Sequence, residues 1–94
     1  MLAVTKRAAA LLKAVKAKEG VADDAGIRIR RGAMPTEPGK VAVGFAISDD
    51  PDPDDEEFGQ EGLRIFVESA LVEPLDGRTL DVRDANEGPE LVFR

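Results

Sequence analysis

The stretch GIRIR, residues 26–30, decides the fold class, because the hydrophobic pattern changes there from that of a helix to that of a strand. Ile27 and Ile29 alternate with Arg28 and Arg30, which is the period of two expected of a half-buried strand with a basic exposed face. The residues before this stretch repeat at helical spacing instead. The chain therefore combines a helix with strands.

The predicted helix lies between Thr5 and Gly20. The Thr5 hydroxyl can accept a hydrogen bond from an unpaired N–H group of the first turn, and Gly20 ends the helix. One face is apolar and consists of Ala8, Leu11, Leu12 and Val15, whereas the opposite face carries Lys6, Lys13 and Lys16. We expect the apolar face to pack on the core and the basic face to be solvated, because no Trp or Phe is present to anchor the helix in lipid.

A strand with two unlike faces follows a loop, which is predicted from Gly32, Pro35, Pro38 and Gly39. One face of this strand is lined by Val41, Val43, Phe45 and Ile47. The other face carries only Ala42, Gly44 and Ala46, so a second layer of the protein or a second subunit can approach it closely.

The C-terminal half contains signals for short strands and turns. Phe58 and the run 63–67 predict a hairpin whose turn lies at residues 60–62. Ser69 is expected to cap a short helical turn that Pro74 ends. The remaining signals are a turn at Asp76 and Gly77, a strand from Leu80 and Val82, and a last strand over residues 91–93. We predict one α+β domain over residues 1–94, a small and mostly antiparallel β-sandwich with one N-terminal amphipathic helix.

The absence of Cys and His limits the chemistry of the chain. Without them there is no thiolate nucleophile, no imidazole base and no soft ligand for zinc, copper or an iron-sulfur cluster. The hydroxyl groups belong to Thr5, Ser48, Ser69, Thr36 and Thr79 alone, and no histidine can activate them. We therefore expect no enzymatic activity, no catalytic residue and no bound cofactor.

The charge distribution argues against nucleic acid as a partner. The formal net charge is −6, with eight basic and three acidic residues over 1–31 and five basic and sixteen acidic residues over 32–94. A duplex binder needs clustered Lys and Arg without such an acidic excess. Lys13 and Lys16 interrupt the N-terminal apolar stretch, so neither a signal peptide nor a membrane span is predicted, and the expected location is the cytoplasm.

The acidic run 49–57 imitates a calcium-binding loop. Counted from Asp50, carboxylates stand at the first, third, fifth and twelfth positions, namely Asp50, Asp52, Asp54 and Glu61. The sixth position, where such loops need glycine, is Asp55, and two prolines stiffen the backbone. We interpret the run as a solvated loop between two strands, whose carboxylates repel one another and keep sheet edges from pairing with other molecules. Weak binding of a divalent cation by the four residues is the alternative.

Several short segments together resemble the HesB/IscA-like proteins, the A-type iron-sulfur cluster carriers. The segments are Val4-Thr5 with Ala8 and Leu11-Leu12, residues 26–29, Glu57-Phe58, residues 62–67 and residues 75–81. The last of them, LDGRTLD, is the most specific. The resemblance spans nearly the whole chain and implies a distorted sandwich with a helix on one side, association into dimers or tetramers, and carriage of iron or clusters.

This family binds its clusters through three cysteines, and the resemblance assigns none of them here. The first ligand position falls within residues 36–38, near Met34, whose thioether is a poor substitute for a thiolate. The two others belong to a Cys-Gly-Cys tail, and no counterpart follows the strand 91–93. We interpret the chain as a degenerate HesB-like protein that binds protein partners of iron-sulfur assembly, alone or as a homo-oligomer. The alternatives are cation carriage by the acidic loop and a cluster shared with a cysteine-bearing partner.

Overall fold

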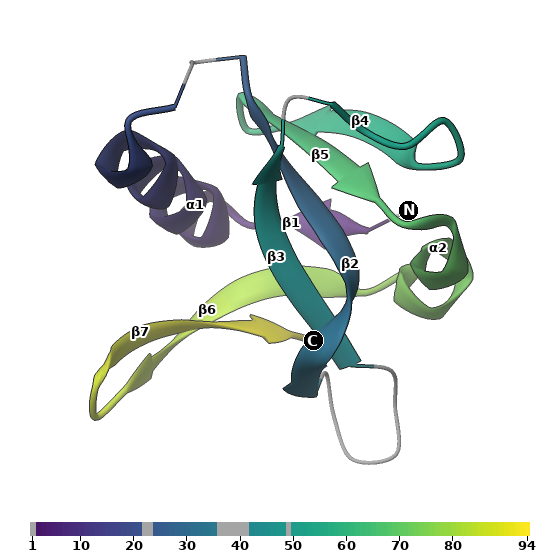
Figure 1. The fold of residues 1–94 in the computed structure, drawn as a ribbon. Coiled ribbons are helices and arrows are strands. Elements are labelled where there is room, and N and C mark those ends of the chain that lie inside the picture. Colours follow the sequence, from purple (N-terminus) through teal and green to yellow (C-terminus); the bar gives the residue numbers. More distant parts are fainter. Residues whose placement is uncertain (1, 22–23, 36–41, 49) are drawn as a thin grey trace.

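Two helices and two β-sheets form the described part of the chain (Figure 1), which in this computed structural model comprises residues 2–21, 24–35, 42–48 and 50–94. In chain order the elements are β1 (Ala3–Val4), α1 (Lys6–Glu19), β2 (Gly26–Pro35), β3 (Ala42–Ser48), β4 (Glu56–Gln60), β5 (Leu63–Val67), α2 (Ser69–Leu75), β6 (Thr79–Ala85) and β7 (Gly88–Phe93).

The strands pair mostly antiparallel, as predicted. One sheet has the order β3-β2-β5-β4 and the other the order β1-β6-β7. The pairs β2–β3, β4–β5 and β6–β7 are antiparallel, whereas β1–β6 and β2–β5 are parallel. In Figure 1, β2 and β3 run across the direction of β6 and β7, with α1 and α2 at opposite sides. The α+β class is therefore confirmed, and α2 is a second helix beside the one predicted as a full element.

The start of α1 is fixed to the three-stranded sheet through a side-chain cap. Thr5 Oγ1 accepts a hydrogen bond from the Ala8 N–H at 3.1 Å, as predicted, and donates one to Asp81 Oδ1 on β6 at 2.9 Å. The Val82 N–H also donates to Asp81 Oδ1, at 2.8 Å. These bonds, led by the one from Val82, lower the pKa of the Asp81 carboxyl below its usual value. The cap therefore joins helix and sheet.

The apolar face of α1 is only partly as predicted. Ala8 and Leu12 are buried, together with Ala9, but Val15 is 41 % exposed. No described residue of α1 beyond Leu12 is buried, because the C-terminal half of the helix extends past the core. Gly20 ends α1 as predicted, in the left-handed conformation with φ of 68°.

One apolar core is shared by both sheets and both helices. Ile27 and Ile29 are buried on β2 as their alternation predicted. The largest fully buried side chains are Phe66, Ile27, Ile29, Leu63, Ile65, Leu71, Leu75, Leu80 and Val43. Among the described residues no polar or charged residue is buried. Removal of apolar surface from water is therefore the main stabilising contribution.

The predicted hairpin and the two glycine turns are confirmed. β4 and β5 pair around a two-residue turn in which Glu61 and Gly62 have φ of 52° and 80°. Positive φ at both central residues is the type I′ geometry that matches the twist of a hairpin. Gly77 follows α2 with φ of 77°, in the turn predicted at Asp76 and Gly77.

Two local predictions are wrong. The loop predicted from Gly32 begins later, because β2 continues to Pro35 with a register shift between Arg31 and Met34. Pairing with β3 overrides the local glycine and proline signals there, and residues 36–41 lie outside the described part. Ser69 is the first residue of α2 and not its cap, because the N-cap is Glu68, whose N–H donates to the Ile29 carbonyl at 2.9 Å. Pro74 lies inside α2.

The start of β2 leaves no space for a side chain at Gly26. A Cβ atom there would lie 2.5 Å from the Phe66 ring and 2.8 Å from the Arg64 carbonyl oxygen. We predict that Gly26→Ala lowers the free energy of unfolding by about 1–3 kcal/mol, the usual effect of overpacking. Urea unfolding followed by circular dichroism measures it. The matched control is Gly59→Ala on β4, whose added Cβ would meet only the Leu63 carbonyl at 3.7 Å; equal losses in both variants would contradict the packing account.

Candidate functional site

The acidic segment is attached to the four-stranded sheet by Arg28. The Arg28 guanidinium donates to both carboxylate oxygens of Asp55, at 2.8 and 3.1 Å, and to Asp52 at 2.8 Å. The Asp55 side chain is 2 % exposed and that of Arg28 19 % exposed. Asp55 also accepts a hydrogen bond from the Asp52 N–H at 3.1 Å. The innermost carboxylate of the segment thus holds the loop on β2.

The electrostatics of this pair favour two charged groups. The hydrogen bond from Arg28 holds the pKa of the Asp55 carboxyl below its usual value. The same bond raises the pKa of Arg28. A bidentate pair between guanidinium and carboxylate is the strongest kind of side-chain hydrogen bond. A carboxylate that is already paired with a guanidinium in this way is a poor ligand for a cation.

The structure does not bring the four predicted cation ligands together. Asp52 faces Arg28, and Asp50 and Asp54 are exposed. Glu61 lies in the β4–β5 turn, beyond the full length of β4. Five residues of extended strand span about 17 Å, so the backbone leads away from the acidic loop instead of wrapping an ion. Over the ranges that the structure describes, no three acidic side chains are placed to hold a metal ion.

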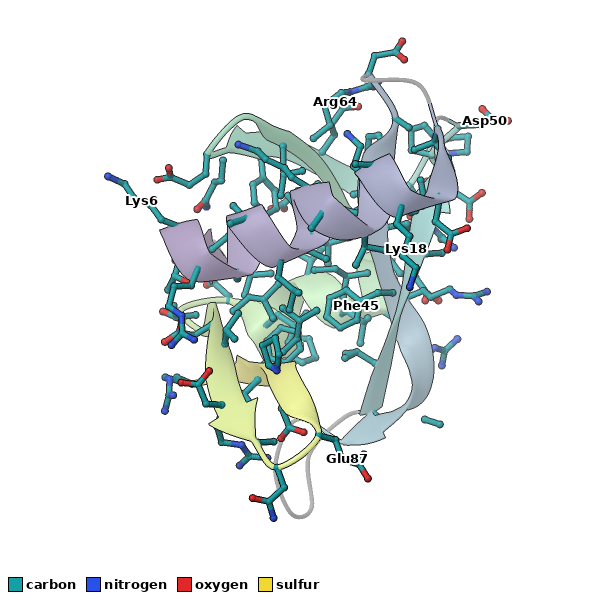
Figure 2. The ribbon with its side chains drawn as sticks, turned by 90° about the vertical axis from the view of Figure 1, so that its left-hand side faces the viewer. Lys6, Lys18, Phe45, Asp50, Arg64 and Glu87 are labelled. Atoms are coloured by element: carbon teal, nitrogen blue, oxygen red, sulfur yellow. The ribbon has the colours of Figure 1, made fainter. Side chains whose placement is uncertain are left out.

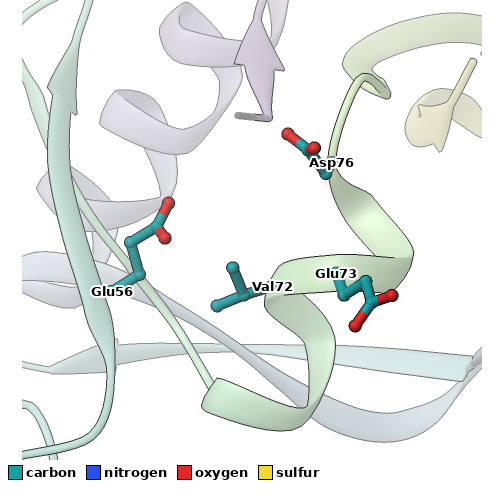
Figure 3. Close-up of a pocket in the computed structure, with 4 residues that line it drawn as sticks. All are labelled: Glu56, Val72, Glu73 and Asp76. Atoms are coloured by element: carbon teal, nitrogen blue, oxygen red, sulfur yellow. The ribbon is translucent and has the colours of Figure 1, made fainter.

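A hollow of about 420 Å³ lies between β4 and α2 and was not predicted from the sequence. Its lining contains Glu56, Val72, Glu73 and Asp76. Figure 3 shows Val72 directed from α2 toward Glu56, with Asp76 at the end of the helix. Three carboxylates and one aliphatic side chain give this hollow a negative character. No sequence motif indicates it, because its residues come from elements that meet only after folding.

The basic residues of α1 are Lys6, Arg7, Lys13, Lys16 and Lys18. Helical spacing places Lys6, Lys13 and Lys16 on one face, the basic face predicted from the sequence. Lys6 and Lys18 lie toward the two ends of α1, and Lys6 projects from the molecule (Figure 2). Arg7 pairs with Asp84 at 2.8 Å, but both side chains are more than half exposed. Such a surface pair contributes little to stability.

The two faces of β3 differ: one carries large apolar side chains and the other carries only small residues. Val43 is buried, whereas Phe45 and Ile47 are half-buried against the core. The Phe45 ring stacks on Phe93 of β7 with a centroid distance of 6.1 Å (Figure 2 shows Phe45). A Cβ at Gly32 on the paired strand β2 would lie 2.6 Å from the Gly44 nitrogen, so the two strands lie close together there. The second layer or second subunit expected over the small residues of β3 stays a prediction.

Comparison with known proteins identifies the fold. The sequence matches no family model and no curated protein. Among solved structures, a crystal structure of IscA with the [2Fe-2S] cluster matches with a TM-score of 0.82 and 23 % identity, over 100 % of this chain and 84 % of that one. The chain has the IscA fold.

Two further structures agree. SufA of Escherichia coli, described as involved in biosynthesis of iron-sulfur clusters, has a TM-score of 0.75 and 22 % identity over 99 % of this chain and 83 % of that one. A protein from Aquifex aeolicus, whose structure was solved by NMR, matches with a TM-score of 0.74 and 22 % identity, over 99 % of this chain and 89 % of that one. The fold expected from the resemblance to the HesB/IscA-like proteins is thereby confirmed.

The residues of this chain do not fit an iron-sulfur cluster. A cluster needs thiolate or imidazole donors, and the 94 residues contain no Cys and no His. Met34 belongs to β2, and residues 36–38, where the resemblance places the first ligand, lie outside the described part. Carboxylates are suited to hard cations and not to sulfide-bridged iron. Neither α1 nor α2 has the length and apolar character of a membrane-spanning helix.

The Arg28–Asp55 pair generates a prediction for stability. We expect Asp55→Ala to lower the free energy of unfolding at pH 7 by roughly 2 kcal/mol, because hydrogen bonds to charged groups are lost. The control is Asp54→Ala, which removes an exposed neighbouring carboxylate and should have an effect within about 0.5 kcal/mol.

The same pair predicts a pH dependence. A carboxyl whose pKa is lowered on folding stabilises the folded state above its unfolded pKa, about 3.9. That stability is lost as the pH falls through the lower folded pKa. The difference between wild type and Asp55→Ala, measured by urea unfolding at several pH values, should therefore be constant at neutral pH and shrink below about pH 4. A difference independent of pH would contradict this role.

Proposed function

We propose that the protein is a non-catalytic binding or regulatory module of iron-sulfur cluster assembly that uses the IscA fold without ligating a cluster. It would act in the cytoplasm through protein partners, with neither nucleic acid nor membrane as its target. The main support for this proposal is that the chain has the IscA fold but lacks the side chains that ligate a cluster. The IscA fold extends over the whole chain, yet no residue of that chain offers a thiolate or an imidazole.

Protein binding is the function that such a scaffold can retain. Function depends on the residues of a site and not on the fold that carries it, so loss of the ligands removes cluster carriage but leaves the surfaces. Two surfaces are available for partners, the basic face of α1 and the β3 strand with its small residues. The hollow between β4 and α2 adds an acidic surface.

Anaerobic reconstitution tests whether the chain ligates a cluster. The protein is incubated with ferrous iron and sulfide, desalted, and compared with an IscA-type carrier that has its cysteines. We predict that the carrier keeps its charge-transfer absorbance and that this chain does not, because it lacks anionic sulfur donors. Absorbance that stays with the chain, with iron and sulfide in equal amounts, would contradict the proposal.

A transfer experiment tests the place in cluster assembly. A loaded IscA-type carrier from the same organism delivers its cluster to an apoprotein while this chain is added in increasing amounts. We predict binding to the carrier or the apoprotein in NMR titrations and a transfer rate that changes until the binding saturates. Absence of both effects would contradict a role in this pathway. A cluster that stays on a complex of both chains would instead support the shared-ligand alternative.

The cation alternative has its own test. Calcium or ferrous iron is titrated into the labelled protein and amide shifts are followed by NMR. We expect no saturable shifts at Asp50, Asp52, Asp54 or Glu61, because Asp52 is paired with Arg28 and Glu61 lies beyond β4. Saturable shifts confined to these four residues would contradict this expectation and support cation carriage by the loop.

A further inference from the structure

Helix α1 is strongly basic in a chain that is otherwise acidic. Its residues include five Lys or Arg and only one acidic side chain, Glu19, so the helix carries a net charge of +4. Because the whole chain has a formal net charge of −6, the residues outside α1 together carry −10. Charge is therefore strongly polarised between the helix and the remainder of the protein, and a partner attracted to the helix has to be acidic.

The side of α1 that points away from the core is uncovered. Ala10, Ala14 and Ala17 lie on the side of the helix opposite the buried Leu12, and all three are exposed. In Figure 2, α1 lies across the near side of the molecule with no other described element in front of it. Alanine side chains are short, so a second helix can come close to the axis of α1 along this row.

Cationic side chains follow both sides of the alanine row. Helical spacing places Lys6 and Lys13 along one side. It places Arg7 and Lys18 along the other, and all four residues are exposed. Arg7 pairs with Asp84, whereas within the described part of the chain no ion pair involves the three lysines. We call the alanine row with its four flanking cations the outer face of α1.

Exposed apolar surface adjoins the outer face at the C-terminal end of α1. Val15 and Val21 are 41 % and 37 % exposed, and they are the large hydrophobic residues that stay exposed in the described ranges. Val15 lies one helical turn before Lys18, and Val21 follows the end of the helix. Because this half of α1 extends past the core, no intramolecular contact buries them. The surface thus offers apolar contact as well as charge.

We infer that the outer face of α1 is the docking site for an acidic amphipathic helix of a protein partner. Large apolar side chains of that helix lie on the alanine row, and carboxylates along both of its sides pair with the lysines. The inference rests on the proposed function for the protein partner and adds the chemistry of its binding segment. An anionic lipid surface fits less well, because α1 has no Trp or Phe and the rest of the chain repels anionic headgroups.

Titration with a designed peptide tests the inference. The probe is a helical peptide with a row of leucines and glutamates on both sides of that row, and the control peptide has glutamine in place of glutamate. We expect saturable NMR shifts of the full labelled chain, centred on α1, with the glutamate peptide alone. Binding should weaken as salt is raised from about 0.1 to 1 M, because the Debye length falls from about 10 to 3 Å. Absence of saturable shifts, equal binding of both peptides or insensitivity to salt would overturn the inference.

Charge reversal tests the named residues. Lys6→Glu combined with Lys18→Glu reverses one charge on each side of the alanine row, and the opposite effects of the two substitutions on the helix dipole largely cancel. The control combines Arg30→Glu with Arg83→Glu, which makes the same change of net charge at exposed positions outside α1. We expect the dissociation constant of the glutamate peptide to rise roughly tenfold in the α1 variant, because attraction becomes repulsion at two exposed pairs.

The control variant should bind the peptide nearly as well as the wild type. Circular dichroism verifies that both variants keep their helix content. Equal weakening in the two variants would overturn the inference, since it would reflect overall charge and not the outer face. Stronger binding to vesicles of phosphatidylserine and phosphatidylcholine than to the peptide would also overturn it. Failure of the peptide to bind removes this inference alone, whereas the transfer experiment decides the proposed function independently.

Discussion

The architecture depends on one apolar core that both sheets and both helices share. Its members are aliphatic side chains and phenylalanines, and within the described ranges no polar or charged residue is buried among them. Such a core is stabilised by the removal of apolar surface from water and needs no ion to neutralise it. This constraint explains how an IscA fold persists in a chain that contains no cysteine and no histidine.

Polar contacts at the margin of the core orient its parts. Asp81 receives hydrogen bonds from Thr5 at the start of α1 and from Val82 on its own strand, so the helix is held on β6. Arg28 and Asp55 hold the acidic segment on β2. The segment LDGRTLD, residues 75–81, which carried the resemblance most specifically, thus contributes a turn and the Asp81 anchor.

Periodicity and turn chemistry predicted the elements but not the contacts between them. The cap at Thr5, the buried alternation of Ile27 and Ile29 and the hairpin turn at Gly62 all follow from local rules and are confirmed. The extension of β2 past Gly32 could not be predicted, because it depends on pairing with β3. The exposure of Val15 depends on where the core ends, which helical spacing alone does not specify.

The candidate sites also divide into features that the sequence predicts and features that depend on contacts between elements. Sequence spacing suggested a cation loop because it treats 50–61 as one coil, whereas residues 56–60 are an extended strand that separates Glu61 from the rest. The Arg28–Asp55 pair and the acidic hollow beside α2 are formed by residues that are distant in sequence, so no sequence motif predicts them. The absence of cluster ligands, in contrast, required only the composition.

The central claim is that the chain folds stably without an inorganic centre. Equilibrium unfolding of chelator-treated protein, with and without added iron, tests this claim directly. The account predicts one cooperative transition with the same midpoint in both samples. Iron held at a concentration 100-fold above its dissociation constant would add about 2.7 kcal/mol to the free energy of unfolding. A gain of that size, or a chain that is unfolded until iron is added, would contradict the account.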